Sequence, residues 1–388
     1  MKVLRTEFRN IKLYKENLVI DFVATDRVVN KEEVYKESTT LNRQKVISIA
    51  GINATGKTLS LRLMKFAFNL LKDNTVLKDE KVEYSLFQEN SEIIIDILIN
   101  DEIFRLKSII GVNQDSAELF MQNKAFYYKN EFIFKKLISE VKKKTDVFMW
   151  DDSQIIFERN TLKIDEQSML NNNHSMIIKI TNQHYLRFIP FIDNTNLNAL
   201  VKGMNYDKVY FNLFDDSLET VEFKEKDNIK IKFKKKMHNY KVMDVSEQFR
   251  LLSSGTIKGT VLLNLITTLF ESEGVGYFIV DELEAHLNKT LVEFLIELFM
   301  DDKINKFGSV LVFTTHYLEI LDSINRKDAI YVSTKDENYN LKLVKFASVI
   351  NRNDVKKSDI LLSNYFGNTA PSYEQMQNIK RALCKRKN

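Results

Sequence analysis

Cysteine is nearly absent from this chain, because only one, Cys384, occurs among its 388 residues. One thiol can build neither an intramolecular disulfide framework nor a cysteine-based zinc site, so both are excluded and a cytoplasmic protein is expected. No stretch approaches roughly 18 uncharged apolar residues, and charges interrupt the start of the chain, so neither a membrane span nor a secretory signal is expected. A sustained apolar heptad repeat is also missing, which excludes a long coiled coil.

The remaining composition is that of a soluble globular protein, with 44% hydrophobic and 28% charged residues. The net charge of +4 permits a polyanionic partner without requiring one. Basic clusters that could contact nucleic acid lie at residues 142–144, 230–241 and 380–387. Such runs are more often solvated faces, so nucleic acid is an open alternative as a partner. An amphipathic helix expected at 373–383 could equally dock a partner subunit.

Glycine is scarce too, yet two of the ten glycines fall in one short motif, GINATGKT at residues 51–58, directly after an apolar run at 46–50. In this pattern backbone N–H groups surround the β-phosphate, the lysine reaches the β and γ oxygens, and the threonine hydroxyl ligates Mg²⁺. The motif predicts a phosphate-binding loop for ATP and Mg²⁺, between a strand and a helix at 59–71. The candidate nucleotide-binding residues are Gly51, Asn53, Ala54, Thr55, Gly56, Lys57, Thr58 and Leu59.

Two carboxylates follow a second apolar run. Residues 277–280 predict a buried strand that ends in Asp281 and Glu282, at the edge of a parallel sheet where α/β folds bind ligands. We expect Asp281 to hold Mg²⁺ and Glu282 to orient and partly deprotonate the attacking water. An isolated pair of this kind is usually a solvated strand end, but the upstream loop favours the catalytic interpretation. Lys57 joins Glu282 as a candidate catalytic residue.

The pattern of apolar residues predicts two kinds of sheet. Antiparallel strands are expected at 3–8, 18–22, 93–99 and 103–107, and the last two form a hairpin with its turn around residue 100. Later in the chain, helices expected at 261–270 and 291–300 alternate with buried strands expected at 277–280 and 310–313. This alternation implies a parallel sheet. The region between is mixed, with strand-like pieces at 126–134 and 229–233 and a helix-like piece at 135–143.

Two further motifs occur in register with the first two. Leu252, Ser253, Ser254 and Gly255 stand just before a helix, and the 310–313 strand leads to His316. A helix N-terminus favours an anion, although a plain N-cap is the simpler interpretation of the serines. A histidine at a strand end can hydrogen-bond a phosphate, although a lone histidine is more often structural.

The four motifs in this order resemble those of ABC-type ATPases, the class that includes SMC, RecF and OLD-like proteins. The resemblance implies that Ser253, Ser254 and Gly255 contact the γ-phosphate of ATP bound by a second subunit, in a head-to-tail homodimer or a higher oligomer. It implies that His316 hydrogen-bonds the γ-phosphate and senses its loss.

The resemblance also assigns less certain roles outside these motifs. Residues 284–288 match the position of the D-loop, with His286 and Asn288 expected near the subunit boundary. Gln88 is the candidate for the metal-contacting glutamine switch, with Gln114 and Gln122 as competitors.

The implied fold is an α/β P-loop NTPase of ABC-ATPase type, a mixed sheet with an antiparallel β subdomain and an inserted α+β region. The N-terminal part of the ATPase domain is expected at 1–110 and its C-terminal part at 246–350. An insert is expected between them at 111–245, and a C-terminal extension at 351–388.

Within this class, the run after Glu282 and the tail at 356–373 resemble bacterial ATPases of abortive-infection and phage-defence operons, described as AAA or OLD/AbiL-like. That likeness implies a nucleotide-dependent switch or scaffold that controls a neighbouring nuclease or toxin, with no membrane partner. An OLD-type nuclease would need a Toprim domain of about 100 residues that the chain has no room for, and an SMC protein would need a coiled-coil arm. A transporter subunit ranks lower because 195 residues separate Thr58 from Ser253. A compact RecF-like DNA-repair ATPase stays open.

Overall fold

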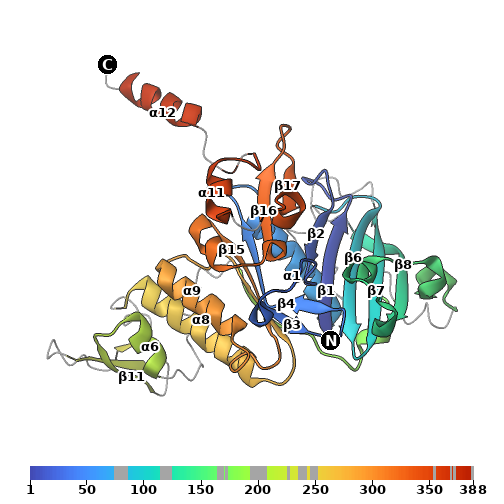
Figure 1. Ribbon diagram of the computed structural model, residues 1–388, viewed down its shortest axis with the longest axis horizontal. Coiled ribbons are helices and arrows are strands. Elements are labelled where there is room, and N and C mark those ends of the chain that lie inside the picture. Colours follow the sequence, from blue (N-terminus) through green and yellow to red (C-terminus); the bar gives the residue numbers. More distant parts are fainter. Residues whose placement is uncertain are drawn as a thin grey trace.

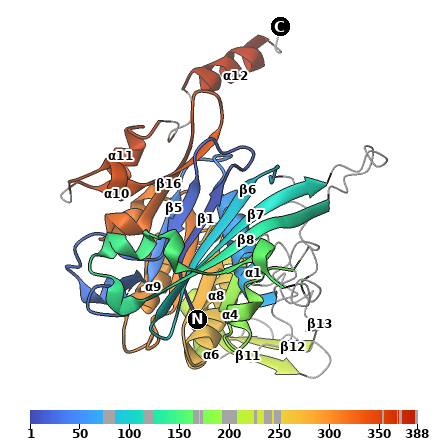
Figure 2. The same ribbon diagram turned by 90° about the vertical axis from the view of Figure 1, so that its right-hand side faces the viewer.

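The computed structural model describes residues 1–73, 86–113, 125–163, 170, 174–192, 208–224, 228–234, 243–244, 252–352, 355–367, 369 and 373–385. Two six-stranded sheets and the helices around them form the body of the molecule, and helix α12 stands away from it (Figures 1 and 2). In the described part of the chain, no helix combines the length and apolar character that a bilayer crossing requires.

The central sheet carries the strands that were expected to be parallel. Its order is β10 (Arg187–Phe191), β14 (Gly276–Val280), β15 (Val310–Thr315), β5 (Val46–Ala50), β16 (Ile330–Lys335) and β17 (Leu341–Lys345). The first five strands are parallel, and β17 returns antiparallel to β16. Strands β5, β14 and β15 are buried at every position, as their mainly apolar sequences predict for strands covered on both faces.

The second sheet is antiparallel throughout. Its order is β2 (Leu18–Asp21), β1 (Lys2–Arg9), β6 (Ser91–Ile99), β7 (Glu102–Asn113), β8 (Ala125–Leu137) and β9 (Ile155–Glu158). The expected hairpin is present, with Asn100 in the left-handed region (φ 52°) at the turn between β6 and β7. Alternate residues of β1 and β6 therefore face the core, and the residues between them face away.

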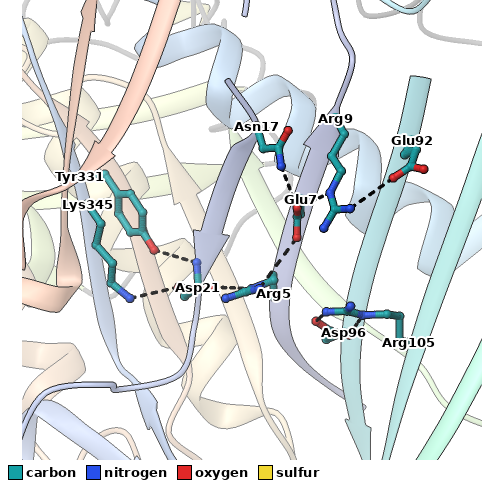
Figure 3. A network of polar contacts seen from close by, with 10 residues as sticks. All are labelled: Arg5, Glu7, Arg9, Asn17, Asp21, Glu92, Asp96, Arg105, Tyr331 and Lys345. Carbon is teal, nitrogen blue, oxygen red and sulfur yellow. Dashed lines mark hydrogen bonds and ion pairs between the residues drawn. The ribbon is translucent and has the colours of Figure 1, made fainter. Parts of the chain in front are cut away.

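The face turned away from the core carries a network of ion pairs (Figure 3). Arg105 pairs with the fully buried Asp96 at 2.7 Å, and Arg5 pairs with Asp21 at 2.6 Å. Asp21 also receives Lys345 Nζ at 3.1 Å from β17, and its backbone N–H donates to Tyr331 Oη of β16 at 2.7 Å. These contacts tie the antiparallel sheet to the outer edge of the central sheet.

Three long helices cover the central sheet. Helix α1 (Lys57–Asp73) shares one core cluster with both sheets and so lies between them. Helices α8 (Ser254–Glu271) and α9 (Lys289–Met300) cover the opposite face in a second cluster (Figure 1). The other α-helices and strands of the described residues are short, apart from α12 near the C-terminus: β3 (Val34–Lys36), β4 (Asn42–Gln44), α4 (Ile178–Thr181), α6 (Lys208–Phe214), β11 (Leu218–Lys224), β12 (Asn228–Phe233), β13 (Met243–Asp244), α10 (Phe346–Val349), α11 (Lys357–Leu362) and α12 (Tyr373–Lys385).

The helix expected at 135–143 is wrong. Strand β8 continues through Leu137, paired with Glu102 of β7, and short 3₁₀ turns follow at Ile138–Glu140 and Lys144–Phe148. Lys136 in this segment is buried, and its Nζ donates to the carbonyls of Asp146 and Met149. Pairing with β7 thus overrides local helix propensity.

The boundary expected at residue 111 falls inside β7. Strands β8 and β9 continue the antiparallel sheet beyond it, and β10 joins the central sheet beside β14. The small sheet of β11, β12 and β13 is separate from both, and α6 contacts α8.

Candidate nucleotide-binding site

The loop between β5 and α1 is held in shape by close backbone contacts. A Cβ added at Gly51 would lie 2.4 Å from the carbonyl oxygen of Ser333 on β16, so only glycine fits there. Gly56 has φ +96°, a conformation that other residues rarely adopt. Ser333 Oγ donates to the carbonyl of Thr55 at 2.7 Å. The sheet therefore fixes both ends of the loop.

Lys57 extends back over this loop. Its Nζ donates to the carbonyls of Gly51 and Ile52, each at 2.8 Å, and lies 3.4 Å from His316 Nδ1. Burial lowers the pKa of Lys57 to about 8, and the nearby carboxylates oppose this shift. A buried ammonium group beside a loop of this shape is suited to meet phosphate oxygens.

Thr58 and Asp281 meet at the carboxyl edge of the central sheet. Thr58 Oγ1 donates to Asp281 Oδ2 at 2.7 Å, and Thr314 Oγ1 donates to Asp281 Oδ1 at 2.5 Å. Among the described residues no group of three or more acidic, histidine or cysteine side chains could hold a metal. A hydroxyl and one carboxylate nevertheless fit Mg²⁺, which prefers oxygen ligands and binds through few protein groups plus phosphates and water. Mg²⁺ bound there would neutralise phosphate charge.

Glu282 and His316 face each other beside this pair. Glu282 Oε1 lies 3.3 Å from His316 Nε2, and the Glu282 N–H donates to Thr314 Oγ1 at 2.7 Å. Glu282 adopts φ +49°, which is unusual for a residue other than glycine. The buried Lys258 of α8 donates to the Glu282 carbonyl at 2.7 Å and helps to hold this conformation. Burial lowers the pKa of Lys258 to about 8.

The buried Glu284 holds the backbone of His316 in place. Its Oε1 accepts the backbone N–H of His316 at 2.5 Å. Glu284 also lies close enough to Lys57 and Lys258 to raise the pKa of each against the effect of burial. Sequence reasoning gave this carboxylate no role.

The serine-bearing motif lies at the N-terminus of α8 and does not line the cavity over the loop of its own chain. Ser253 caps the helix, accepting the Thr256 N–H at 3.0 Å, so the plain N-cap interpretation is correct as local structure. Ser254 Oγ lies 3.2 Å from His286 Nδ1, and a Cβ on Gly255 would meet the His286 carbonyl oxygen at 2.4 Å. Both serines are exposed, as a contact with a second molecule would require.

The remaining expected residues have other surroundings. Asn288 caps α9 by accepting the Leu291 N–H at 2.9 Å. Gln88 donates its amide to Asn10 Oδ1 at 2.6 Å and does not line the cavity described below, so its role at the metal stays a prediction. Gln114 and Gln122 lie outside the described residues.

A cavity of about 680 Å³ opens over the loop. The expected residues that line it are Asn53, Ala54, Gly56, Lys57, Thr58, Leu59, Glu282 and His316. Sequence reasoning missed the others, which are Leu13, Arg62, Lys335, Tyr339 and Leu341. Apart from Arg62 on α1 they come from the loop before β2 and from the β16–β17 hairpin, and no local motif marks them.

Comparison with known families fits this geometry. A family model described as an AAA domain, putative AbiEii toxin, type IV TA system, matches residues 46–322. The chain belongs to this family. The matched segment of this AAA domain begins with β5 and includes the loop, the N-terminus of α8 and the ends of β14 and β15. Family membership confirms the expected relation to P-loop ATPases of the abortive-infection type.

Two other comparisons add less. The SMC head domain from Thermotoga maritima is structurally similar with a TM-score of 0.41 and 11% sequence identity, covering 89% of this chain and 99% of that one. No curated protein matches the sequence.

Proposed function

We propose that this AAA domain binds and hydrolyses ATP as a head-to-tail dimer, and that its nucleotide state controls a partner nuclease or toxin in a bacterial anti-phage, abortive-infection system. The observation that carries the catalytic part is the convergence of Lys57, Thr58, Asp281, Glu282 and His316 at one edge of the central sheet. The family's description as a putative toxin of a type IV TA system supports the defence part.

The hydrolytic step divides among residues already in contact. Lys57 would leave the loop carbonyls and neutralise the β and γ oxygens. Glu282 would orient the attacking water and accept its proton, and His316 would donate a hydrogen bond to the γ-phosphate. Thr314 holds Asp281 and the Glu282 backbone together, which keeps the two acidic side chains in register.

A second copy of the chain would supply the serine-bearing helix N-terminus that one chain does not bring to its own cavity. Ser253, Ser254 and Gly255 do not line the cavity, but they lie at the N-terminus of an 18-residue helix, where both serines are exposed. N–H groups at a helix N-terminus favour a phosphate anion. Gly255 packs on the His286 carbonyl, so the loop after Glu282 would move with the α8 terminus. ATP held between two copies would thus link dimer geometry to the catalytic loop.

Glu282→Gln tests the catalytic assignment. We expect phosphate release to fall at least about 100-fold with ATP binding retained, because the base is lost but the loop is intact. The same variant should form an ATP-dependent dimer in size-exclusion chromatography with light scattering. Glu319→Gln, an exposed carboxamide substitution outside the cavity, serves as the matched control. Unchanged turnover in the Glu282 variant would remove this residue from its role.

Ser254→Arg separates dimer formation from nucleotide binding. A bulky cation at the exposed α8 terminus should leave ADP affinity unchanged and abolish the ATP-dependent dimer.

Lys57→Ala should abolish nucleotide binding and any biological output together. If phage defence or toxicity survives Lys57→Ala, nucleotide does not drive the output.

The defence role is tested by what the protein binds. A nuclease or toxin that copurifies in an ATP-dependent manner would support the switch. Tight DNA binding by the purified chain alone, weakening steeply with salt, would instead favour the RecF-like repair function.

A further inference from the structure

The cavity over the phosphate loop has an apolar end that the catalytic residues do not use. Leu13, Tyr339 and Leu341 line this end, and residues 53–54 and 56–59 of the loop line the cavity with them. The side chains of Leu13 and Tyr339 are 57% and 81% exposed, respectively. Two large side chains, a leucine and a tyrosine, exposed beside one cavity mark a place where a ligand would cover them.

The backbone holds both side chains in this position. Leu13 and Tyr339 have φ values of +69° and +63°, a conformation that costs free energy for residues other than glycine or asparagine. Asp336 Oδ1 stabilises the turn that carries Tyr339 by accepting the N–H groups of Asn338 (2.9 Å) and Asn340 (2.8 Å).

A direct link joins the two segments. The Leu341 N–H donates to the Leu13 carbonyl at 2.7 Å, and Tyr14 forms a β-bridge with Leu341. Tyr14 Oη in turn lies 3.2 Å from Ser60 Oγ, on the first turns of α1. The apolar end of the cavity is therefore fixed relative to the phosphate loop.

We propose that Leu13, Tyr339 and Leu341 form the binding surface for the base of the nucleotide, with the Tyr339 ring stacking on it. This inference rests on the proposed function, because it takes the phosphates to lie on Lys57 and Thr58. A cavity lined both by those residues and by this apolar surface fits a ligand with a charged chain at one end and a flat, weakly polar ring at the other. Aromatic stacking accepts any base, so ATP and GTP should bind alike.

Binding of ADP and of pyrophosphate by isothermal titration calorimetry tests this assignment on the full chain. The two ligands share the diphosphate, and only ADP carries a base. Tyr339→Ala should weaken ADP binding about tenfold, the loss expected for one stacked base, and change pyrophosphate binding less than about twofold. Tyr339→Phe should keep the affinity for ADP, because the ring and not the hydroxyl makes the contact. Tyr185→Ala removes an equally exposed tyrosine outside the cavity and should change neither affinity.

The outcomes separate this inference from the function beneath it. If the wild-type protein binds both ligands but Tyr339→Ala weakens both equally or neither, the base does not lie on Tyr339 and the inference fails while the phosphate site stands. If Lys57→Ala binds ADP as the wild type does, the phosphate site itself is wrong, and the inference fails with it.

Discussion

Nucleotide affinity should depend on pH through Lys57. Burial lowers the pKa of this ammonium group from 10.5 to about 8, with Asp281, Glu282 and Glu284 opposing the shift. Nucleotide phosphates beside Nζ would favour the charged form and raise the pKa again. Binding above pH 8 must therefore take up a proton, and affinity should fall as pH rises.

The size of the effect follows from the fraction of Lys57 that is charged before binding. With a pKa of about 8, roughly nine tenths of Lys57 is protonated at pH 7 and roughly one tenth at pH 9. The affinity for ADP should therefore drop about tenfold between these values. Calorimetry at pH 8 in two buffers of different ionisation enthalpy should show about half a proton taken up per ADP. The absence of proton uptake at pH 8 would refute the argument.

Lys258 offers a competing source of the same proton, because burial also lowers its pKa to about 8. Its Nζ donates to the Glu282 carbonyl rather than to the phosphate loop, so Lys258→Met should leave the uptake in place. Loss of the uptake in that variant would move the assignment from Lys57 to Lys258.

Stability without nucleotide should follow the opposite trend. Because the pKa of Lys57 is lowered in the folded state, the unfolded chain binds more protons between about pH 8 and 10.5. The contribution of Lys57 to the free energy of unfolding therefore rises with pH across that window. Relative to Lys57→Met, the wild-type melting temperature should increase from pH 8 to pH 10.

Three further predictions concern side-chain packing, two beside the site and one in the antiparallel sheet. Gly255→Ala forces a Cβ to within 2.4 Å of the His286 carbonyl oxygen, so ATP turnover should fall about tenfold or more while ADP affinity stays unchanged in calorimetry. Lys258→Met should lower kcat about tenfold with KM unchanged in a steady-state phosphate assay, with partial rescue by Lys258→Arg, whereas a rise in KM alone would contradict a positioning role. Arg159→Ala leaves the fully buried Glu131 without its cation and should cost about 3–5 kcal/mol in urea unfolding; a loss below about 1 kcal/mol would show that the hydroxyl and backbone donors around Glu131 suffice.

Local patterns were enough to predict the central part of the fold. Strands β5, β14 and β15 consist mainly of consecutive apolar residues, and helix α1 follows its glycine-containing loop directly. Such runs report burial on both faces whatever the neighbouring strand is. The same reasoning failed at 135–143, where the neighbouring strand decides. Lys136 has a charge that suits a surface helix, but it lies in a strand paired with β7, and its Nζ is 4.1 Å from the centre of the Trp150 ring.

The apolar end of the cavity was not predictable for a related reason. Leu13 and Tyr339 are more than 300 residues apart in the chain and meet only because β17 turns back beside the loop before β2. Neither lies in a periodic segment, and an isolated exposed leucine or tyrosine is ordinary on a protein surface. The motif identified the phosphate end of the site because its chemistry is encoded in consecutive residues, whereas the other end is assembled from distant ones.

The support of Asp281 and Glu282 lies between these two cases. Thr314 has no distinguishing feature in the sequence, yet it donates to Asp281 and accepts the Glu282 N–H. The register of the sheet explains this position, because Val280 pairs with Phe313, so the residue after each lies at the same level of the sheet edge. Suppose that an acidic pair follows one parallel strand and that the neighbouring strand is known. The residue after the last apolar position of that neighbour is then a candidate to position the acidic pair. The motifs name the groups that would touch phosphate, and the strand order decides which ordinary residues hold them there.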